Sequence, residues 1–427
     1  MSAAICRLGG WQHNAARVLP EKQRIDDRVA ELFVPVILII SLLTFFIWVF
    51  FGGIDVVSHG LFAALSVLVV ACPCAVGLAT PVALAAGLNK AARNHILIRD
   101  TSALEQMRNV DVVVFDKTGT LTEGHPTVIG WLWAQGQEEH YKDVLLAAES
   151  TSDHPLAEAI VTALEGEEQV IPAHLDGFEN ITGKGVRVAY QGAEYWVGSH
   201  KLLKDYQANL SDILADMLTQ YESDGNSIVY FGRENDLLAV IAIKDQLRVT
   251  SMEAIRELRI QDIEICMLTG DGERTASSVA GSLGIMRFVA DAMPDDKEDF
   301  IHKLQLQGKT VAMVGDGVND AQALSCADVS IAMGKGTDTL MDTAMITLRT
   351  SDLLLLPKVF RLSRQTVSLM YRNLFWAFIY NTVGIFVAAG VLYPVYDILL
   401  SPALAGAAMA LSCVSVALSS LRLSSRF

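Results

Sequence analysis

Four long apolar stretches set the two ends of the chain apart from its mixed central region. They are Phe33–Phe51, Gly60–Leu88, Leu374–Tyr396 and Ile398–Leu421. A helix needs roughly 20 apolar residues to cross the hydrocarbon layer of a membrane, and none of these stretches contains Asp, Glu, Lys or Arg. We therefore predict four transmembrane helices; the alternative is a set of buried helices in a soluble protein.

Positive charges flank these stretches on one side only. Lys and Arg lie before the first and third stretches and after the second and fourth, whereas the connectors Gly52–His59 and Tyr393–Leu400 contain neither. Loops rich in Lys and Arg stay on the cytoplasmic side. We therefore expect an integral membrane protein with both termini and the central region in the cytosol.

The central region alternates short apolar runs with helical patterns. The strand-like runs are Val110–Phe115, Leu238–Ile243, Ile263–Leu268 and Val311–Val314, and the helical patterns include Thr250–Leu258 and Arg274–Leu283. This alternation predicts an α/β domain, in which helices flank a parallel sheet and functional loops follow the carboxyl ends of its strands.

A second domain is predicted inside the first, because the stretch from Gly124 to Leu237 has strand-like runs of its own, Gly185–Tyr190 and Ser227–Phe231. The predicted organisation is a tail over 1–28, two transmembrane helices over 29–92, an α/β domain over 93–123 and 238–348, an inserted domain over 124–237, and a stalk with two more transmembrane helices over 349–427.

Composition and charge agree with this division. The 427 residues are 52% hydrophobic, with a mean hydropathy of +0.35 and a net charge of −15, so nothing favours nucleic acid as a partner. Met1–Gly10 lacks an apolar core long enough for a signal peptide. Of six cysteines, only Cys72 and Cys74 are close in sequence, and we expect reduced thiols rather than a disulfide framework.

Three short motifs in the central region point to phosphoryl chemistry. In order they are Asp116-Lys117-Thr118-Gly119-Thr120, Thr269-Gly270-Asp271 and Gly315-Asp316-Gly317-Val318-Asn319-Asp320. An aspartate at a strand end, beside a turn rich in Thr and Gly, can take a phosphoryl group as an acyl phosphate. Each motif alone could be a helix cap or a surface turn. Together and in this order they resemble the P-type ATPases, a branch of the haloacid dehalogenase-like fold.

The resemblance implies a Rossmann-like phosphorylation domain that is split by an α+β nucleotide-binding domain. The catalytic residues that it implies are Asp116 as the nucleophile, Thr118, Thr269, Lys297, Asn319 and Asp320. Thr269 would bind the phosphoryl oxygens and Lys297 would offset their charge. Asn319 would bond to the phosphate or to Asp320.

Mg²⁺ is the implied metal cofactor of this site. Asp116, Asp316 and Asp320 would supply the hard oxygen ligands that Mg²⁺ prefers, and the backbone at Thr118 would supply another. Related phosphatases carry an acid at the position of Thr118. Without that acid the acyl phosphate should hydrolyse slowly, as a pump requires.

The inserted domain carries two motifs that resemble the nucleotide site of heavy-metal pumps. Ser152-Asp153-His154-Pro155-Leu156-Ala157 contains the histidine that would contact the adenine of ATP, with Glu149 shortly before it. Gly183 and Gly185 match a later Gly-x-Gly element, in which missing side chains would let the nucleotide approach the backbone. Either motif alone is more often an ordinary turn.

Cys72-Pro73-Cys74 lies in the middle of the second apolar stretch and suggests the cargo. Proline there removes a backbone hydrogen bond and opens the helix, and ionisable groups inside a membrane mark a pathway by default. Thiolates are soft ligands that select Cu(I) or Zn(II) over Mg²⁺ or Ca²⁺. The alternative is two small buried cysteines beside a kink.

Other residues of the apolar stretches favour copper over zinc. In the zinc and cadmium branch the last span carries an Asp and the preceding one a Lys, and neither is present here. Tyr380, Asn381 and Met409 instead resemble the copper branch, and Cys413 replaces a serine of its motif. We expect Cu(I), or the equivalent Ag(I), as cargo; the alternatives are a zinc or cadmium pump, a copper-sensing or copper-buffering fragment, and a soluble phosphatase.

Some parts of a complete pump are not found in this chain. It has no Thr-Gly-Glu, the loop with which an actuator domain positions water in the family, and no Cys-x-x-Cys module near its start. We therefore expect either a fragment or a chain that needs an actuator-bearing partner, and a copper chaperone is a further possible partner. The resemblance implies a location in the bacterial inner membrane.

Overall fold

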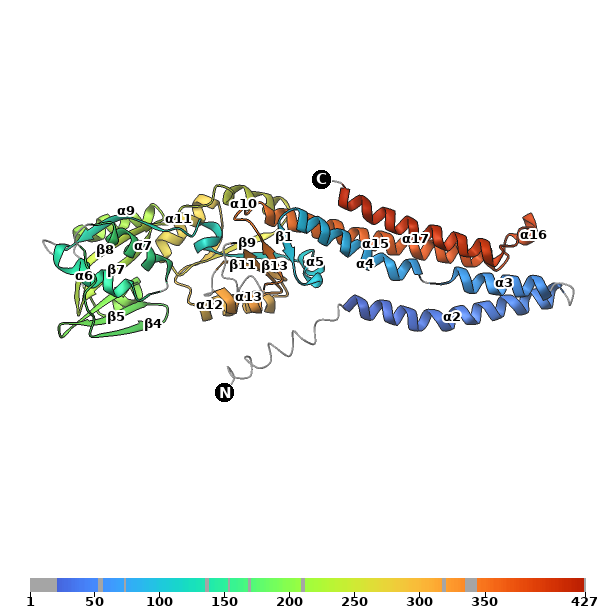
Figure 1. The fold of residues 1–427 in the computed structure, drawn as a ribbon, viewed down its shortest axis with the longest axis horizontal. Coiled ribbons are helices and arrows are strands. Elements are labelled where there is room, and N and C mark those ends of the chain that lie inside the picture. The colour runs from blue at the N-terminus through green and yellow to red at the C-terminus, as the bar shows by residue number, and fades with distance from the viewer. Residues whose placement is uncertain are drawn as a thin grey trace. The chain divides into compact units, whose positions relative to one another are not determined.

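The computed structural model describes residues 21–52, 57–72, 74–134, 138–152, 154–167, 170–208, 212–316, 320–334 and 344–425. The chain forms two compact units, one made of Met1–Arg93 and Arg361–Phe427 and the other of Asn94–Phe360. Figure 1 shows the elements of both units.

The first unit is helical. Its helices are α2 (Glu21–Gly52), α3 (Val57–Val70), α4 (Cys74–Arg93), most of α15 (Leu355–Ala388), α16 (Tyr393–Tyr396) and α17 (Pro402–Ser425). Three of the described stretches are long and apolar enough to cross a membrane: Phe33–Phe51, Val57–Arg93 and Pro402–Arg422. The count of four transmembrane helices therefore stays a prediction.

The third predicted stretch is wrong at its carboxyl end. We predicted Leu374–Tyr396, but α15 ends at Ala388 and the short α16 follows. Gly390 lies in the turn between them with φ of +91°, and its N–H donates to the carbonyl oxygen of Val387 at 3.1 Å. A left-handed glycine ends a helix regardless of how apolar the next residues are.

The second predicted stretch is interrupted at its cysteine motif, as expected. α3 ends at Val70 and α4 begins at Cys74, while Pro73 lies outside the described residues. A proline cannot donate the backbone hydrogen bond that would continue the helix. The helix is thus interrupted between Val70 and Cys74.

Small residues allow close packing of the helices around this break. Ala75 of α4 packs in one cluster with Ala377 of α15 and Val416 of α17. A Cβ atom added to Gly384 of α15 would lie 2.4 Å from Val70 Cγ1. Close approach through Ala and Gly is typical of helix pairs in membranes.

A seven-stranded sheet organises the α/β domain of the second unit, which the resemblance predicts to be the phosphorylation domain. Across the sheet its strands are β1 (Ile96–Ile98), β13 (Ile346–Leu348), β12 (Val329–Met333), β11 (Val311–Gly315), β2 (Val112–Asp116), β9 (Glu264–Leu268) and β10 (Arg287–Val289). All neighbouring pairs are parallel except β1 with β13. Every residue of β2 is buried, as a continuous apolar run predicts for a central parallel strand.

Helices cover this sheet. They are α5 (Thr101–Met107), α10 (Ser251–Ile260), α11 (Glu273–Leu283), α12 (Pro294–Leu306) and α13 (Ala321–Cys326). Ile301 and Leu304 of α12 and Leu324 of α13 pack against the strands, and Figure 1 shows α10 on the other side of the sheet. The predicted architecture of helices around a parallel sheet is confirmed.

A six-stranded antiparallel sheet forms the inserted domain. Its order is β3 (Thr127–Trp133), β8 (Asp236–Lys244), β7 (Ser227–Arg233), β6 (Ala193–Gly198), β5 (Gly185–Tyr190) and β4 (Gly177–Ile181). Its helices are α6 (Glu138–Glu149), α7 (Pro155–Glu165), α8 (His200–Asp205) and α9 (Asp212–Ser223). Tyr195 and Val197 join the cluster formed with α6 and α7, whereas Trp196 joins the cluster formed with α8 and α9. Because side chains alternate along a strand, helices cover both faces.

The predicted boundary at residue 238 is wrong. We placed Leu238–Ile243 in the parallel sheet, but it forms most of β8, which pairs with β3 and β7 in the antiparallel sheet. The run is continuously apolar because both faces of that sheet are covered, and Leu238–Ile243 is buried throughout. A strand that is buried on both faces looks the same in sequence whichever sheet it belongs to.

The two segments that join the sheets run side by side. Thr122 forms an antiparallel bridge with Leu247, and the N–H of Glu123 donates to the carbonyl oxygen of Gln246 at 2.8 Å. The inserted domain therefore starts and ends at one paired ribbon, directly after the turn that follows Asp116.

Candidate active site

Three neighbouring parallel strands bring the motif residues together. β11, β2 and β9 are adjacent, and Asp316, Asp116 and Thr269 lie at or directly after their carboxyl ends. Parallel strands place these ends along one edge of the sheet. The three motifs, which lie far apart in the sequence, thus meet at one place.

Lys297 joins two of the predicted carboxylates. It lies in the first turn of α12, and its Nζ is 2.6 Å from Asp116 Oδ1 and 2.7 Å from Asp320 Oδ1. All three side chains are buried. Burial alone would lower the pKa of Lys297, but the two carboxylates raise it above its usual value. The lysine therefore stays positively charged beside the proposed nucleophile.

Asp116, Asp316 and Asp320 form a cluster that fits a magnesium ion. One carboxylate oxygen of each lies within 4.8 Å of the others. Burial, together with the negative charge of Asp116, raises the pKa of Asp316 to about 7 and also raises the pKa of Asp320. Crowded carboxylate oxygens with raised pKa values match the hard ligands that Mg²⁺ prefers, and a cation would offset their repulsion.

The turn after Asp116 requires glycine at position 119. Gly119 has φ of +71°, and a Cβ atom there would lie 1.5 Å from Asp316 Oδ2. Arg248, which sequence reasoning missed, donates from Nε to the carbonyl oxygen of Thr120 at 3.0 Å and from its guanidinium to that of Gly119. Thr118 is half-buried in this turn. The arginine thus fixes the loop against the carboxylate cluster.

A buried lysine, Lys117, forms an ion pair with the partly buried Asp271, and sequence reasoning did not assign this pair. Lys117 Nζ lies 2.5 Å from Asp271 Oδ2, and Ser227 Oγ and Thr269 Oγ1 each donate to Asp271 at 2.6 Å. Burial alone would raise the pKa of Asp271, but Lys117 and these hydrogen bonds lower it. The Thr269 hydroxyl therefore donates its hydrogen bond to Asp271. Its side chain must rotate before it can donate to a phosphoryl group.

Ser227 connects this ion pair to the inserted domain. It is the first residue of β7, and Lys117 Nζ also donates to Ser227 Oγ at 3.1 Å. The same two charges act on His154. Its pKa is lowered overall, mainly by burial and also by Lys117, whereas Asp271 acts in the opposite direction. Ser227 thus brings the inserted domain into contact with the motifs that contain Lys117 and Asp271.

The residues that the sequence predicts for a nucleotide site also have local structural roles. His154 caps α7, because its Nδ1 accepts a hydrogen bond from the N–H of Leu156 at 3.2 Å. Glu149 ends α6, and burial raises its pKa to about 7. A Cβ atom on Gly185 would lie 2.1 Å from the carbonyl oxygen of Val197.

The glycines of this motif therefore have a packing reason that sequence reasoning missed. A Cβ atom on Gly183 would lie 2.6 Å from Met293 Cε, and Gly183 has φ of +70°. Packing within the protein accounts for both glycines, and their contact with a nucleotide stays a prediction. Asn319 lies outside the described residues.

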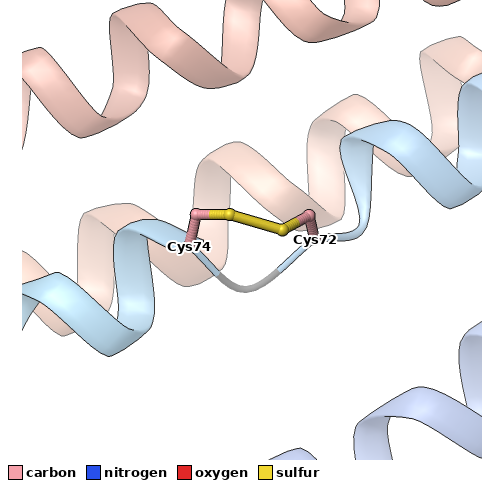
Figure 2. The surroundings of a disulfide bond; sticks show 2 residues. All are labelled: Cys72 and Cys74. Atoms are coloured by element: carbon pink, nitrogen blue, oxygen red, sulfur yellow. A yellow bond between two sulfur atoms is a disulfide. The ribbon is translucent and has the colours of Figure 1, made fainter.

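Cys72 and Cys74 are joined by a disulfide bond (Figure 2). This corrects the expectation of two reduced thiols. Only one residue separates them, and the helix is interrupted there, so their sulfur atoms can meet. A metal ion could bind both sulfur atoms only after reduction, because the thiolate is the ligand.

Asn381 is a buried polar residue of α15 at the level of the break. This residue is 3% exposed. The amide nitrogen Nδ2 and oxygen Oδ1 are both buried and have no hydrogen-bond partner among the described residues. Asn381 lies on α15 one turn from Ala377, which packs with Ala75, and one turn from Gly384, which faces Val70. Since Val70 and Ala75 flank the break, Asn381 lies at its level.

Met409 and Cys413 lie on the face of α17 that packs against the residues flanking the break. Cys413 packs against the cluster that contains Ala75, and Ala405 packs against Val70. Met409 lies between them, four residues from each, and residues four apart share a helix face. Met409 is therefore also at the level of the break.

Tyr380 is placed differently from these residues. Its side chain is 44% exposed, and its ring stacks on that of Trp376 at 5.9 Å between centroids. Tyr380 precedes Asn381 by one residue, and consecutive residues on a helix point about 100° apart. The structure thus does not gather Tyr380 with the other predicted ligands.

Comparison with known proteins gives first the protein family and then individual proteins that are similar to this chain. Residues 110–328, just over half of the chain, match the family model of the haloacid dehalogenase-like hydrolases, and the chain belongs to that family. The chain is 43% identical to a copper-exporting P-type ATPase of Legionella pneumophila over 98% of its length. It is 44% identical to a silver-exporting P-type ATPase of Salmonella typhimurium over 94% of its length. The resemblance to copper-type P-type ATPases is confirmed.

The chain spans about half the length of these curated relatives, 57% and 49% respectively. Among solved structures, it is similar to a zinc-transporting PIB-type ATPase in the E2.Pi state, with a TM-score of 0.67 and 32% identity over 93% of this chain and 63% of that one. It is also similar to the catalytic domain of the CPx-ATPase CopB-B, with a TM-score of 0.53 and 28% identity over 64% of this chain and 97% of that one.

Proposed function

We propose that this chain is the catalytic and membrane part of a pump that uses ATP to export Cu(I), or the equivalent Ag(I), through a phosphoaspartate on Asp116. The observation that carries the proposal is the Asp116 carboxylate at the end of β2, 2.6 Å from Lys297 and within the carboxylate cluster. Relatives named for copper and silver export support the choice of cargo.

In the proposed reaction, a carboxylate oxygen of Asp116 attacks the γ-phosphorus of ATP. The bond from that phosphorus to the bridging oxygen breaks, and ADP leaves with the electron pair. Phosphoryl transfer needs positioning and charge neutralisation above all. Lys297 supplies a fixed positive charge, and Thr269, once rotated from Asp271, would donate a hydrogen bond to a phosphoryl oxygen.

Mg²⁺ would be held by Asp116 and Asp316, with Asp320 close by, and when bound it neutralises the phosphate oxygens. Asp320 accepts a hydrogen bond from Lys297, which leaves its other oxygen for the metal or its water. The backbone at Thr118 would complete the site. The raised pKa of Asp316 supports this role, because a divalent cation would make its ionised form favourable.

The inserted domain would bind the nucleotide through His154 and Glu149, with Gly183 and Gly185 close by. The charges of Lys117 and Asp271 act on the pKa of His154, which supports a nucleotide that reaches from this histidine to the phosphorylation site. Because Thr118 replaces the acid of related phosphatases, the phosphoaspartate would hydrolyse slowly until an actuator domain acts. A partner chain with that domain, and a copper chaperone, remain part of the proposal.

Cu(I) would bind at the interrupted helix after the disulfide is reduced. Cys72 and Cys74 would supply thiolates, Met409 a thioether and Cys413 a third thiol, all soft ligands. Asn381 would supply a neutral oxygen; this is supported by its amide group, which has no hydrogen-bond partner among the described residues. Tyr380 could join only after α15 rotates.

A zinc pump is the second candidate, since one solved relative transports zinc. The described spans offer no additional carboxylate near the break to balance a divalent charge, which favours a monovalent cargo. The proposed location is the bacterial inner membrane, with the second unit and both termini in the cytosol; the Lys and Arg residues that flank the spans support this orientation.

The test is transfer of ³²P from labelled ATP to the reduced full chain in detergent, followed by acid quenching. We expect an acid-stable label that Asp116→Asn abolishes and that Asp111→Asn retains. Asp111 is the matched control, because it is an exposed carboxylate near the opposite end of β2. Label that persists in Asp116→Asn, or that is absent from the wild-type chain, would contradict the proposal, and the second result would favour a copper-binding fragment.

The choice of metal is tested in the same assay. We expect labelling to fall when Cu(I) is chelated and to lose this dependence in Cys72→Ser/Cys74→Ser. Labelling that instead follows Zn(II) would favour the zinc pump.

A further inference from the structure

Glu298, His302 and Cys326 form a cluster on the phosphorylation domain that the phosphoryl chemistry does not use. Cys326 Sγ lies 3.4 Å from Glu298 Oε1, and His302 Nε2 lies 3.5 Å from the same oxygen. One ligand atom of each residue lies within 4.8 Å of the other two. The cluster combines a thiol, an imidazole and a carboxylate.

These separations suit a tetrahedral metal site. With bonds to zinc of about 2.0–2.3 Å, neighbouring ligand atoms of a tetrahedron lie roughly 3.3–3.8 Å apart. Two of the three pairs, at 3.4 and 3.5 Å, already have this spacing. Glu298 and His302 lie four residues apart on α12, which places them on one helix face.

A second layer of contacts orients the ligands. The side-chain oxygen of Gln305 lies 3.2 Å from His302 Nδ1, so it can accept the Nδ1 proton and leave Nε2 for a metal. The amide nitrogen of Gln305 donates to the carbonyl oxygen of Cys326 at 2.9 Å and to Asp328 Oδ2 at 3.2 Å. Metal-binding histidines commonly donate their other nitrogen proton to such a partner.

We propose that Glu298, His302 and Cys326 form a zinc site that ties α12 to the end of α13. A thiolate and an imidazole favour zinc over Mg²⁺, and the carboxylate favours Zn(II) over Cu(I). Thiolate and carboxylate together balance the two charges of the ion. All three side chains are partly exposed, so water can enter and supply the fourth ligand.

The site adjoins the proposed active site without sharing a residue with it. Glu298 follows Lys297 on α12, and α13 begins directly after Asp320. Lys297 and Asp320 form a buried ion pair. Bound zinc would hold together α12, which carries Lys297, and α13, which follows Asp320. The zinc site does not depend on the proposed transport, because it needs no part of the membrane unit.

The test uses Co(II) as a spectroscopic probe of the full chain in detergent, with Zn(II) as the competitor. The background is Cys72→Ser/Cys74→Ser, which removes the membrane thiol pair, and excess Mg²⁺ occupies the carboxylate cluster. We expect a thiolate-to-cobalt charge-transfer band in the near ultraviolet that Zn(II) abolishes. Cys326→Ser in this background should remove the band, whereas the matched variant Cys413→Ser should keep it.

Affinity then separates a built site from a single reactive thiol. His302→Ala should weaken Zn(II) binding by more than tenfold, and Gln305→Ala, which removes only the orienting partner, should weaken it about 10–100-fold. Circular dichroism checks that each variant is folded. A band that survives Cys326→Ser, a band that disappears in Cys413→Ser, or equal Zn(II) affinity in all variants would overturn the proposal.

Discussion

Replacing Asp316 by asparagine should stabilise the second unit while it removes activity. The pKa of Asp316 rises from 3.8 to about 7 in the folded protein. A carboxyl with a raised folded pKa weakens stability at every pH above its unfolded pKa, because the unfolded chain ionises more easily. This penalty is absent below about pH 4, grows as the pH rises to about 7 and is constant above that.

The size of the effect follows from the shift. About three pKa units at 1.36 kcal/mol each give an upper limit of about 4 kcal/mol. Since Asp316 is only partly buried, we expect Asp316→Asn to raise the free energy of unfolding by about 2–4 kcal/mol at pH 8 without Mg²⁺. The gain should shrink toward zero below pH 4, and added Mg²⁺ should reduce it by binding the wild-type carboxylates.

The assay is thiol labelling of Cys266 as urea is increased. This cysteine is fully buried in β9, so it reacts only when the phosphorylation domain opens, and mass spectrometry reads its peptide separately. Asp236→Asn, at an exposed position, is the control and should leave the urea midpoint unchanged. A destabilised Asp316→Asn variant, or an equal gain at pH 4 and pH 8, would refute the reasoning.

Two further substitutions test the same site. Lys297→Met should lower the free energy of unfolding by about 3–5 kcal/mol, because it breaks a buried ion pair. The control Lys309→Met, in a partly exposed pair, should lower it by less than about 1 kcal/mol. Equal losses for the two variants, measured by Cys266 labelling, would contradict this. Gly119→Ala should reduce ³²P labelling more than tenfold, because its Cβ would lie 1.5 Å from Asp316 Oδ2. Gly308→Ala shares a positive φ but has open space around it, and it should label normally; a similar loss in both variants would show that backbone strain is the cause.

The sequence by itself predicted the chemistry that we propose for the phosphorylation site. β2, β9 and β11 appear as apolar runs, and each is followed by a polar motif. In a parallel sheet such motifs meet at the carboxyl edge, so local pattern and topology together predicted that Asp116, Thr269 and Asp316 would gather. Lys297 was added from the family resemblance, and the ion pairs of Lys297 agree with that role.

Only the tertiary structure decided which groups hold this site together. Arg248, Asp271 and Ser227 act through contacts between residues far apart in the chain, and no local pattern encodes such a contact. The sequence likewise did not determine which sheet contains β8, because a strand buried on both faces looks the same in either sheet. Nor did it determine the orientation of Tyr380, because a shift of one residue along a helix leaves the apolar composition unchanged. Hydrophobic periodicity reports which side chains are buried, and it does not report against which partner.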